Sequence, residues 1–265
     1  MRARRIVPAL AFLIGLIVLF SCSQSYSSPE KIDIVVLISA DAEWKSSAEY
    51  FTGMKPGLTP FGEFFVSAVK SDLRTKSVIY FHGGWGKINA AASTQYAIDR
   101  WQPTLLINLG TCGGFEGNID TGDVLVVTKT VVYDIIEQMG NSDEAVEYYS
   151  VVLDLSWLKK PYPAAVKESI LVSADRDIMA GEIPRLRKKF GAVAADWESG
   201  AIAFTAKQNK IPCLILRAVS DLVGSGGGEV YGNIELFEKR TRRIMANLLA
   251  GLPAWVGAAE NLFAR

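Results

Sequence analysis

Apolar, β-rich runs alternate with helical patterns along most of this chain, and that alternation restricts the folds it can adopt. The runs are continuously apolar, which is typical of strands buried on both faces of a sheet. They lie at Ile32–Ile38, Ser77–Phe81, Thr104–Asn108, Val124–Val132, Ser169–Ser173 and Pro212–Val219. Helices are expected between them, at Asp41–Phe51, Lys87–Trp101, Pro184–Phe190, Glu198–Asn209 and Ile234–Leu252. This order predicts an α/β fold in which helices cover both faces of a largely parallel sheet.

The N-terminal thirty residues have the pattern of an export signal. Arginines at positions 2, 4 and 5 precede the apolar run Ile6–Phe20, and a basic segment followed by a short apolar one is typical of secretory signals. The apolar run is shorter than the roughly 20 residues that a membrane-spanning helix needs. The segment Leu19–Cys22 ends in a small residue followed by cysteine and resembles the bacterial lipobox.

This pattern predicts three segments. Residues 1–22 are expected to be a lipoprotein-type signal peptide, residues 23–30 a polar tether, and residues 31–265 a single folded domain. Cys22 would then become the lipid-acylated N-terminal residue, and the domain would be exported and anchored to the bacterial cell envelope. The alternative is that the apolar segment stays uncleaved as a short anchor, which also holds the domain at a membrane.

Composition excludes several kinds of function. The chain has 28 Lys and Arg residues and 28 Asp and Glu residues, so its net charge is zero. It has no basic run of the kind that would indicate nucleic-acid binding. His82 is the single histidine, which excludes a multi-histidine metal site and leaves one position for a Ser-His-Asp triad. The cysteines lack zinc-site or redox-pair spacing, so neither a metal nor a cofactor is expected. Cys112 and Cys213 lie in apolar stretches and are expected to be free, buried thiols.

Three carboxylates follow expected strands, where ligands bind in such folds. Asp221 comes after the run that ends at Val219, and the glycines at 224 and 226–228 behind it are interpreted as a flexible lid. Glu198 begins a helix of small residues that can approach the sheet and a ligand closely. Glu43 follows the first strand. Each also has a plainer interpretation, as a helix cap, a turn former or a favourable acid in a first helical turn.

Two glycine-rich turns are expected after strands, at Gly83–Lys87 and Gly110–Phe115. Neither has the GxxxxGK[ST] spacing of a P-loop or the GxGxxG spacing of dinucleotide binders. They indicate that the backbone lies close to a ligand or to another backbone segment.

Taken in order, three blocks resemble the purine nucleoside phosphorylase and nucleosidase superfamily, and in particular its 5′-methylthioadenosine/S-adenosylhomocysteine nucleosidases. The blocks are Gly84–Lys87, then Ile107–Gly114 with Gly122–Val124, then Asp196–Ala201 with Arg217–Asp221. The resemblance covers most of the chain from Lys31 to Leu252. It implies a nucleoside phosphorylase-like fold, a single-domain three-layer α/β/α sandwich around a mostly parallel mixed sheet.

The resemblance also implies a reaction, the hydrolysis of the N-glycosidic bond of an adenosine-type purine nucleoside, with or without a 5′-thio substituent. Asp221 would be the general acid that protonates the base, oriented by Ser220, while Glu198 holds the ribose and Glu43 activates water. The residues that match the lining around ribose and base are Thr111, Cys112, Gly113, Ile178 and Trp197. An anionic site suits the positive charge that develops on the sugar, and the acid needs a pKa raised by burial.

Phosphorolysis and nucleoside binding without turnover are the alternatives. The resemblance implies that phosphorylases of the superfamily hold phosphate with two arginines. This chain has Asn108 at the position of one of them, and its segment Ser39–Tyr50, where the other would lie, contains no arginine. Glu43 would also repel phosphate, so water is the expected co-substrate. A non-catalytic binding lipoprotein would be expected to lack the acid or the ribose carboxylate, and this chain has both.

Two departures from the family pattern bear on the substrate. Asp177 stands where typical bacterial relatives place an aromatic residue against the base, and Trp197 replaces the usual methionine below the ribose. The resemblance further implies a homodimer. Export, if it occurs, means that the substrate is a purine nucleoside outside the cytoplasm.

Overall fold

The computed structural model describes residues 31–71 and 74–263. The predicted signal peptide at 1–22, the tether at 23–30 and the lipidation site Cys22 lie outside these residues. The strands are β1 (Ile34–Ile38), β2 (Gly57–Leu58), β3 (Glu63–Lys70), β4 (Thr75–His82), β5 (Leu105–Phe115), β6 (Val124–Val132), β7 (Val151–Val152), β8 (Lys167–Ser173), β9 (Ala192–Asp196), β10 (Cys213–Gly224) and β11 (Gly227–Gly228). The helices are α1 (Asp41–Ser46), α2 (Gly86–Trp101), α3 (Ser142–Tyr148), α4 (Ile183–Phe190), α5 (Ser199–Gln208) and α6 (Ile234–Ala258), with 3₁₀ turns at Ala48–Phe51, Ala180–Glu182 and Glu260–Phe263.

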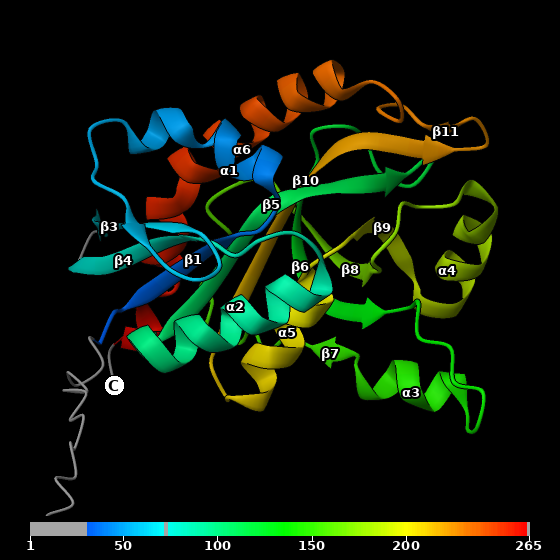
Figure 1. Ribbon diagram of the computed structural model, residues 1–265, viewed down its shortest axis with the longest axis horizontal. Coiled ribbons are helices and arrows are strands. Elements are labelled where there is room, and N and C mark those ends of the chain that lie inside the picture. Colours follow the sequence, from blue (N-terminus) through cyan, green and yellow to red (C-terminus); the bar gives the residue numbers. More distant parts are fainter. Residues whose placement is uncertain (1–30, 72–73, 264–265) are drawn as a thin grey trace, which may run out of the picture.

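A mixed sheet runs through the protein, and β5 pairs with three strands in it, β1, β10 and β9 (Figure 1). β1 and β10 lie parallel to β5 on either side of it, and β4 lies parallel to β1. β6 pairs antiparallel with β10, β8 pairs parallel with β6 and with β9, and β9 returns to the end of β5. Strands β5, β10, β6, β8 and β9 therefore close into a ring, while β1, β4, β3 and β2 extend the sheet on one side.

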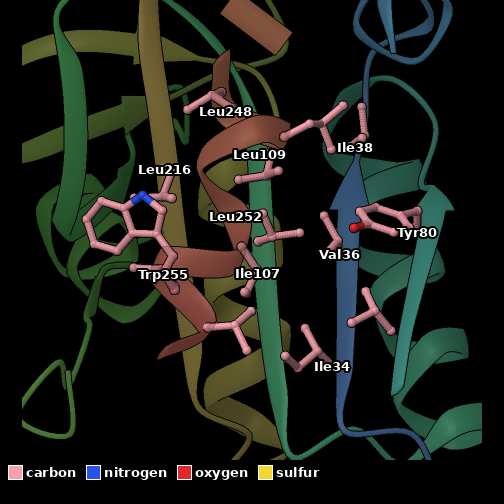
Figure 2. Close-up of a cluster of buried hydrophobic side chains, with 14 of the residues drawn as sticks. Ile34, Val36, Ile38, Tyr80, Ile107, Leu109, Leu216, Leu248, Leu252 and Trp255 are labelled. Carbon is pink, nitrogen blue, oxygen red and sulfur yellow. The ribbon is translucent and has the colours of Figure 1, made fainter. Parts of the chain in front are cut away.

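Helices cover the two faces of the sheet, and each face has its own hydrophobic core. On one face Leu252 and Trp255 of α6 share a core with Val36 (Figure 2). On the other face Trp101 of α2 shares a core with Val35, and α5 contributes to the same cluster. Val35 and Val36 are both 0% exposed, so β1 is buried on both sides, as its continuous apolar sequence predicts. Within the described ranges, no helix has the length and apolar character needed to cross a bilayer.

The predicted α/β sandwich is confirmed, and each predicted apolar run forms a strand. Five further strands, β2, β3, β7, β9 and β11, are not predicted from the sequence, and β3 and β9 are the longest of them. β3 alternates between buried and exposed residues at the side of the sheet, and β9 is a five-residue strand rich in alanine, a residue with low β propensity. The predicted helix at Asp41–Phe51 ends at Ser46 and continues as a 3₁₀ turn.

The predictions for two glycine-rich segments are wrong in detail. Residues 110–115 belong to β5 and do not form a turn after it, because β10 runs alongside them until Val223 pairs with Phe115. The glycines behind Asp221 form the end of β10 and the short partner strand β11, so the expected lid is a β-hairpin. A bulge between Val219 and Asp221 interrupts the register of β10, and such a bulge re-aims the side chains beside it.

Replacing Leu249 with alanine tests how strongly α6 contributes to the fold. Leu249 is fully buried in the core beneath this helix, and its truncation removes apolar contacts and leaves a cavity. We expect the free energy of unfolding to fall by about 2–5 kcal/mol, as measured by urea denaturation. The control Asn247→Ala, on the exposed face of the same helix, should change it by less than about 0.5 kcal/mol. Equal losses in the two variants would contradict this packing.

Candidate active site

A cavity of about 680 Å³ opens at the edge of the sheet beyond β1, beside the distal parts of β5 and β10. The three carboxylates predicted from sequence line it and are nearly buried: Glu43 is 4% exposed, Glu198 6% and Asp221 4%. The six predicted binding residues line the same cavity: Thr111, Cys112, Gly113, Ile178, Trp197 and Ser220. The structure thus brings every sequence-predicted site residue of the domain into one pocket.

Glu43 lies in the first turn of α1, directly after β1, and its carboxylate crosses to β5. Oε1 accepts hydrogen bonds from the backbone N–H of Thr111 at 2.5 Å and from its hydroxyl at 2.9 Å, and Oε2 accepts from the N–H of Ala40 at 3.4 Å. Burial raises the pKa of Glu43, against the opposing effects of the Arg217 charge and the Thr111 hydrogen bonds. Glu43 is therefore a fixed, desolvated carboxyl group with a higher proton affinity than an exposed glutamate.

Glu198 caps the start of α5 and reaches the start of α2. Its Oε1 accepts a hydrogen bond from the backbone N–H of Gly86 at 3.0 Å. Burial, together with the nearby carboxylates of Asp196 and Glu43, raises the pKa of Glu198 to about 8. Glu198 therefore binds a proton more readily than an exposed glutamate, and the charge of Glu43 contributes to this shift.

Asp221 lies at the bulge of β10, beside Ser220. The Ser220 Oγ is 2.6 Å from Asp221 Oδ1 and 3.2 Å from the carbonyl oxygen of Cys112. Burial raises the pKa of Asp221, while the Ser220 hydrogen bond and the charge of Arg240 oppose this shift without cancelling it. Asp221 is therefore better suited than an exposed aspartate to carry a proton into the pocket.

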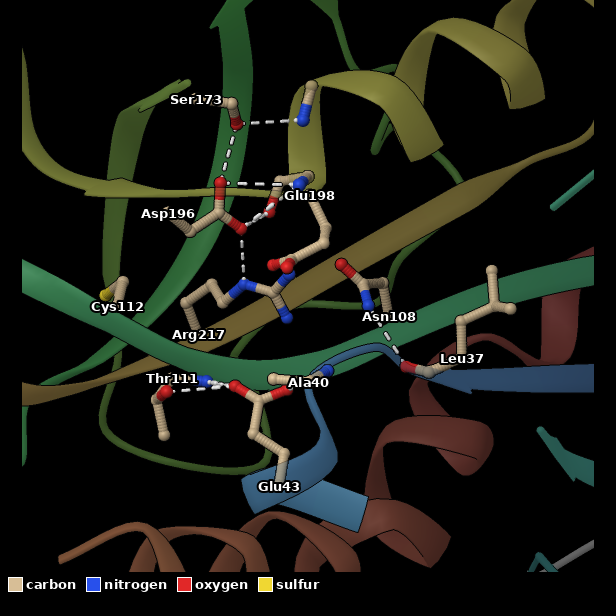
Figure 3. Close-up of polar contacts among 12 residues, drawn as sticks. Leu37, Ala40, Glu43, Asn108, Thr111, Cys112, Ser173, Asp196, Glu198 and Arg217 are labelled. Atoms are coloured by element: carbon tan, nitrogen blue, oxygen red, sulfur yellow. Dashed lines mark hydrogen bonds and ion pairs between the residues drawn. The ribbon is translucent and has the colours of Figure 1, made fainter. Parts of the chain in front are cut away.

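Arg217 and Asp196 form a buried ion pair behind these carboxylates, and sequence reasoning did not select either residue. Arg217 Nε donates to Asp196 Oδ2 at 2.8 Å, and the two side chains are 1% and 3% exposed. Burial lowers the pKa of Arg217, but the three carboxylates around it outweigh burial and raise that pKa above its usual range (Figure 3). Arginine inside the otherwise apolar run of β10 was the sequence signal that could have revealed this pair.

Asp196 is held by several donors besides Arg217. Ser173 Oγ donates to Oδ1 at 2.6 Å, and the backbone N–H of Ser199 donates to Oδ2 at 3.1 Å. The Ser199 hydroxyl also donates to Oδ2. Because Ser199 begins α5, Asp196 fixes the start of this helix and the orientation of Arg217 together (Figure 3).

Glycine is required at two places where groups approach closely. A Cβ at Gly110 would lie 2.4 Å from Arg217 Nη1 and 2.7 Å from Glu43 Oε1, so the guanidinium and the carboxylate flank the same point of β5. A Cβ at Gly200 would lie 2.6 Å from the side chain of Val132. This second contact confirms that the small residues of α5 let the helix start close to the sheet.

Asn108, at the place of a phosphate-binding arginine in related phosphorylases, is fully buried in β5. Its Nδ2 donates to the backbone carbonyl of Leu37 at 3.0 Å. The side chain therefore contacts β1 and adds no positive charge to the pocket.

Aromatic and apolar side chains form other parts of the wall. Trp85 and Trp197 pack together with 4.6 Å between ring centroids and 34° between ring planes. The Tyr231 hydroxyl donates to the carbonyl oxygen of Ile178 at 3.1 Å, which ties the segment after β11 to the segment after β8. Asp177 lines the pocket with an exposed carboxylate. Cys112 and Cys213 are buried free thiols, as predicted.

The sheet closes into a ring of five strands and extends on one side through β1, β4, β3 and β2. Together with the carboxylate-lined pocket, this sheet defines a nucleoside phosphorylase-like α/β protein. The family model described as "Phosphorylase superfamily" matches residues 34–252, and the chain belongs to this superfamily. A 5′-methylthioadenosine/S-adenosylhomocysteine nucleosidase of Staphylococcus aureus (strain JH9) is 31% identical over 209 residues, which are 71% of this chain and 88% of that protein.

Solved structures show the same fold. A Helicobacter pylori 5′-methylthioadenosine/S-adenosyl homocysteine nucleosidase superposes with a TM-score of 0.67 at 18% identity and covers 84% of this chain and 99% of its own. A futalosine hydrolase of Helicobacter pylori strain 26695 superposes with a TM-score of 0.66 at 17% identity and covers 83% of this chain and 97% of its own. At these identities the likeness establishes the fold alone.

The substitution Glu198→Gln tests the charge balance of the pocket. The pKa of Glu198 is 4.5 in the unfolded chain and about 8 in the folded protein, so folding takes up a proton at any pH between these values. The contribution of Glu198 to the free energy of unfolding therefore declines as pH rises from 4.5 to about 8. Glutamine has no such dependence. We therefore expect the melting temperature of Glu198→Gln, relative to the unaltered chain, to rise by several degrees between pH 5 and pH 9, at roughly 2–4 °C per kcal/mol.

Differential scanning fluorimetry across that pH range measures the trend. Glu144→Gln, which removes an exposed carboxylate on α3, is the matched control and should show no comparable trend. A constant difference between Glu198→Gln and the unaltered chain would contradict the raised pKa of Glu198.

Proposed function

We propose that this protein hydrolyses the N-glycosidic bond of an adenosine-type purine nucleoside, with 5′-thio-substituted adenosines as the first candidates. The observation that carries the proposal is the convergence of Asp221, Glu43 and Glu198 on one pocket, where burial raises the pKa of each. The name of the Staphylococcus aureus relative supports the 5′-thio class. A futalosine hydrolase has the same fold, so the fold alone does not select the 5′-thio class.

Asp221 is the proposed general acid. The Ser220 hydroxyl donates to Asp221 Oδ1, which leaves Oδ2 to carry a proton that faces the pocket. A protonated Asp221 can then donate its proton to the imidazole nitrogen of the purine as the bond to the sugar breaks. The base leaves as a neutral molecule, which lowers the barrier to cleavage.

Glu43 is the proposed base that activates water. Oε1 is occupied by the two Thr111 donors, while Oε2 has one long bond to Ala40 and keeps capacity for a water proton. Arg217 Nη1 has no hydrogen-bond partner among the described residues and flanks the same point as Glu43. A water in the pocket would donate to Oε2 of Glu43, which lines the pocket. Its oxygen attacks the anomeric carbon, and its proton passes to Glu43.

Glu198 is the proposed anchor of the ribose. Gly86 occupies Oε1, which leaves Oε2 to accept hydrogen bonds from the sugar hydroxyls. Its negative charge also favours the positive charge that develops on the sugar in the transition state. Trp197 precedes Glu198 in the chain and Trp85 precedes its hydrogen-bond donor Gly86, so the Trp85–Trp197 pair lies beside this carboxylate and supplies an apolar wall for the sugar.

Hydrolysis is favoured over phosphorolysis by the charges of the pocket. Among the described residues that line it, Arg176 is the cationic one, and its guanidinium pairs with Glu182 at 2.6 Å. Asn108 faces Leu37, and Glu43 would repel a phosphate. Phosphorolysis and binding without turnover remain the alternatives that the assay below separates.

The assay measures base release from 5′-methylthioadenosine in buffer without phosphate. We expect release of adenine at a rate that added phosphate does not increase. Asp221→Asn should lower kcat by roughly 10²–10⁴-fold, the usual contribution of a general acid, while leaving the binding of a substrate analogue nearly unchanged. Asp177→Asn removes an exposed carboxylate from the same pocket and should change kcat by less than about ten-fold.

Other outcomes would assign another function. Base release only with phosphate identifies a phosphorylase, and tight binding without release identifies a nucleoside-binding protein. Full activity of Asp221→Asn would contradict the acid role of that residue.

We also propose that the chain is exported, acylated at Cys22 and held at the cell envelope, on the strength of its N-terminal pattern. A homodimer is proposed as well. Exposed apolar side chains near the pocket mouth support it, since Trp85 is 57% exposed and Ile88, one turn along, is 83% exposed. Sedimentation of the purified protein would distinguish a dimer from a monomer.

Cys22→Ser tests the anchor. In a bacterial host, we expect the unaltered chain to incorporate a labelled fatty acid and to fractionate with membranes. The variant should incorporate none, because it lacks the acylated thiol. Cys213→Ser, at a buried thiol of the domain, is the control and should still be labelled. Equal labelling of both variants would rule out Cys22 as the lipid site.

A further inference from the structure

Basic side chains gather at the end of the domain opposite the pocket, although the whole chain carries no net charge. Five exposed residues define this basal surface: Lys31, Arg100, Lys159, Lys207 and Lys210. They come from segments far apart in the sequence, at the start of β1, the end of α2, the turn before β8 and the end of α5.

Hydrogen bonds hold the first two of these segments together. Lys31 precedes β1, and the backbone N–H of Ile32 donates to the carbonyl oxygen of Trp101 at 3.0 Å. Arg100 is therefore next to the point where the described chain begins. The pocket lies beyond the other end of β1, so β1 separates the two regions along its length (Figure 1).

The end of α5 lies beside α2 and opens onto a second cavity. Gln95 of α2 and Asn209 exchange hydrogen bonds of 3.2 and 2.7 Å between their side-chain amides. Lys207 and Lys210 flank Asn209 in the chain. Both lysines line a cavity of about 390 Å³, together with Trp157.

The remaining segment closes the surface on the side of α6. The backbone N–H of Lys159 donates to the carbonyl oxygen of Ala258 at 2.9 Å, at the end of α6. Leu262 and Trp157 both line the 390 Å³ cavity. Lysines, an indole and an aliphatic side chain thus meet at one end of the domain.

Acidic groups offset this charge only in part. The carboxylates of Glu168 and Glu260 are paired with Lys160 and Lys76, whereas Asp33 accepts hydrogen bonds from the neutral Ser77 and keeps its charge. Asp99 and Asp154 remain as exposed acids beside the basal surface in the described part of the chain. The surface therefore keeps an excess of positive charge in an otherwise neutral protein.

We propose that the basal surface binds the anionic phospholipid headgroups of the bilayer to which the chain is anchored, and that the pocket opens away from the membrane. The proposal takes its setting from the export and anchoring proposed above and is independent of the proposed reaction. Each basic residue close to an anionic bilayer strengthens binding by roughly five-fold. Tryptophan is also enriched where proteins meet the membrane interface, and Trp157 lines the 390 Å³ cavity beside Lys207 and Lys210.

The short length of the predicted tether also favours an orientation in which the basal surface faces the bilayer. Residues 23–30 span at most about 29 Å when fully extended, whereas a domain of this size is roughly 45 Å across. Lys31 lies at the end opposite the pocket, so a pocket facing the bilayer would place Lys31 beyond the reach of the tether. The basal surface is therefore the one that the tether brings to the lipid.

A chain of residues 31–265 tests the surface without the anchor. It contains both sheet-face cores, and the solved Helicobacter pylori relative, which is covered over 99% of its own chain, folds on the matching region. Co-sedimentation is measured with vesicles of phosphatidylcholine alone and with phosphatidylglycerol added. We expect binding only to the anionic vesicles, and weaker binding as salt concentration rises.

The double variant Lys207→Gln/Lys210→Gln should lower the partition coefficient on anionic vesicles by at least roughly ten-fold. Arg187→Gln/Lys188→Gln, on exposed positions of α4, removes the same charge elsewhere and should lower it by less than about three-fold. Equal losses in the two variants, equal binding to neutral vesicles, or no binding would overturn the proposal.

Base release by the same proteins in solution separates this proposal from the proposed reaction. The Lys207→Gln/Lys210→Gln variant should release base as fast as the unaltered chain, because neither lysine lies near the pocket. Vesicle binding without any base release would contradict the reaction while supporting the basal surface. Base release without vesicle binding would overturn the basal surface alone.

Discussion

The buried ion pair between Arg217 and Asp196 is the interaction on which the site depends. It places one positive charge beneath a pocket whose wall carries Glu43 and Glu198. A guanidinium buried to this extent is tolerated because Asp196 is itself satisfied by Ser173 and by the start of α5. Loss of one partner of such a buried pair typically costs about 3–5 kcal/mol, because it leaves an uncompensated charge. The same pair therefore fixes both the start of α5 and the charge of the pocket.

Arg217 is one cation facing three carboxylates, those of Asp196, Glu43 and Glu198. Burial raises the pKa of both glutamates, and the charges of Asp196 and Glu43 add to the shift that takes the pKa of Glu198 to about 8, so both groups bind a proton more readily than exposed glutamates. A sugar that becomes positive in the transition state relieves the repulsion that disfavours the ionised carboxylates. In the proposed reaction, the site would therefore be better matched to the transition state than to a neutral nucleoside, which is the condition for catalysis.

Sequence reasoning located the strands and the pocket residues more readily than the groups that hold them. Asp221, Glu198 and Glu43 follow apolar runs, whose carboxyl ends meet at one edge, but the resemblance to the nucleosidases was needed to select them over plainer interpretations. Arg217 was overlooked because a charge inside an apolar strand has meaning only when its partner is known, and Asp196 lies 21 residues away. The continuation of β5 through its glycines was equally hidden, because close approaches at Gly110 depend on side chains from other strands.

The direction of the parallel strands also links the position of the pocket to the proposed anchoring of the chain. β1 is the first strand of the domain and lies next to β5 in its interior, so the chain enters at one end of the sheet and Glu43 follows at the other. Carboxylates gather where the parallel strands end, and lysines of the basal surface gather where they begin. In a protein tethered through its N-terminus, this arrangement sets the acidic pocket away from an anionic bilayer. A nucleoside arriving from the aqueous phase then reaches the pocket without first crossing the lipid surface.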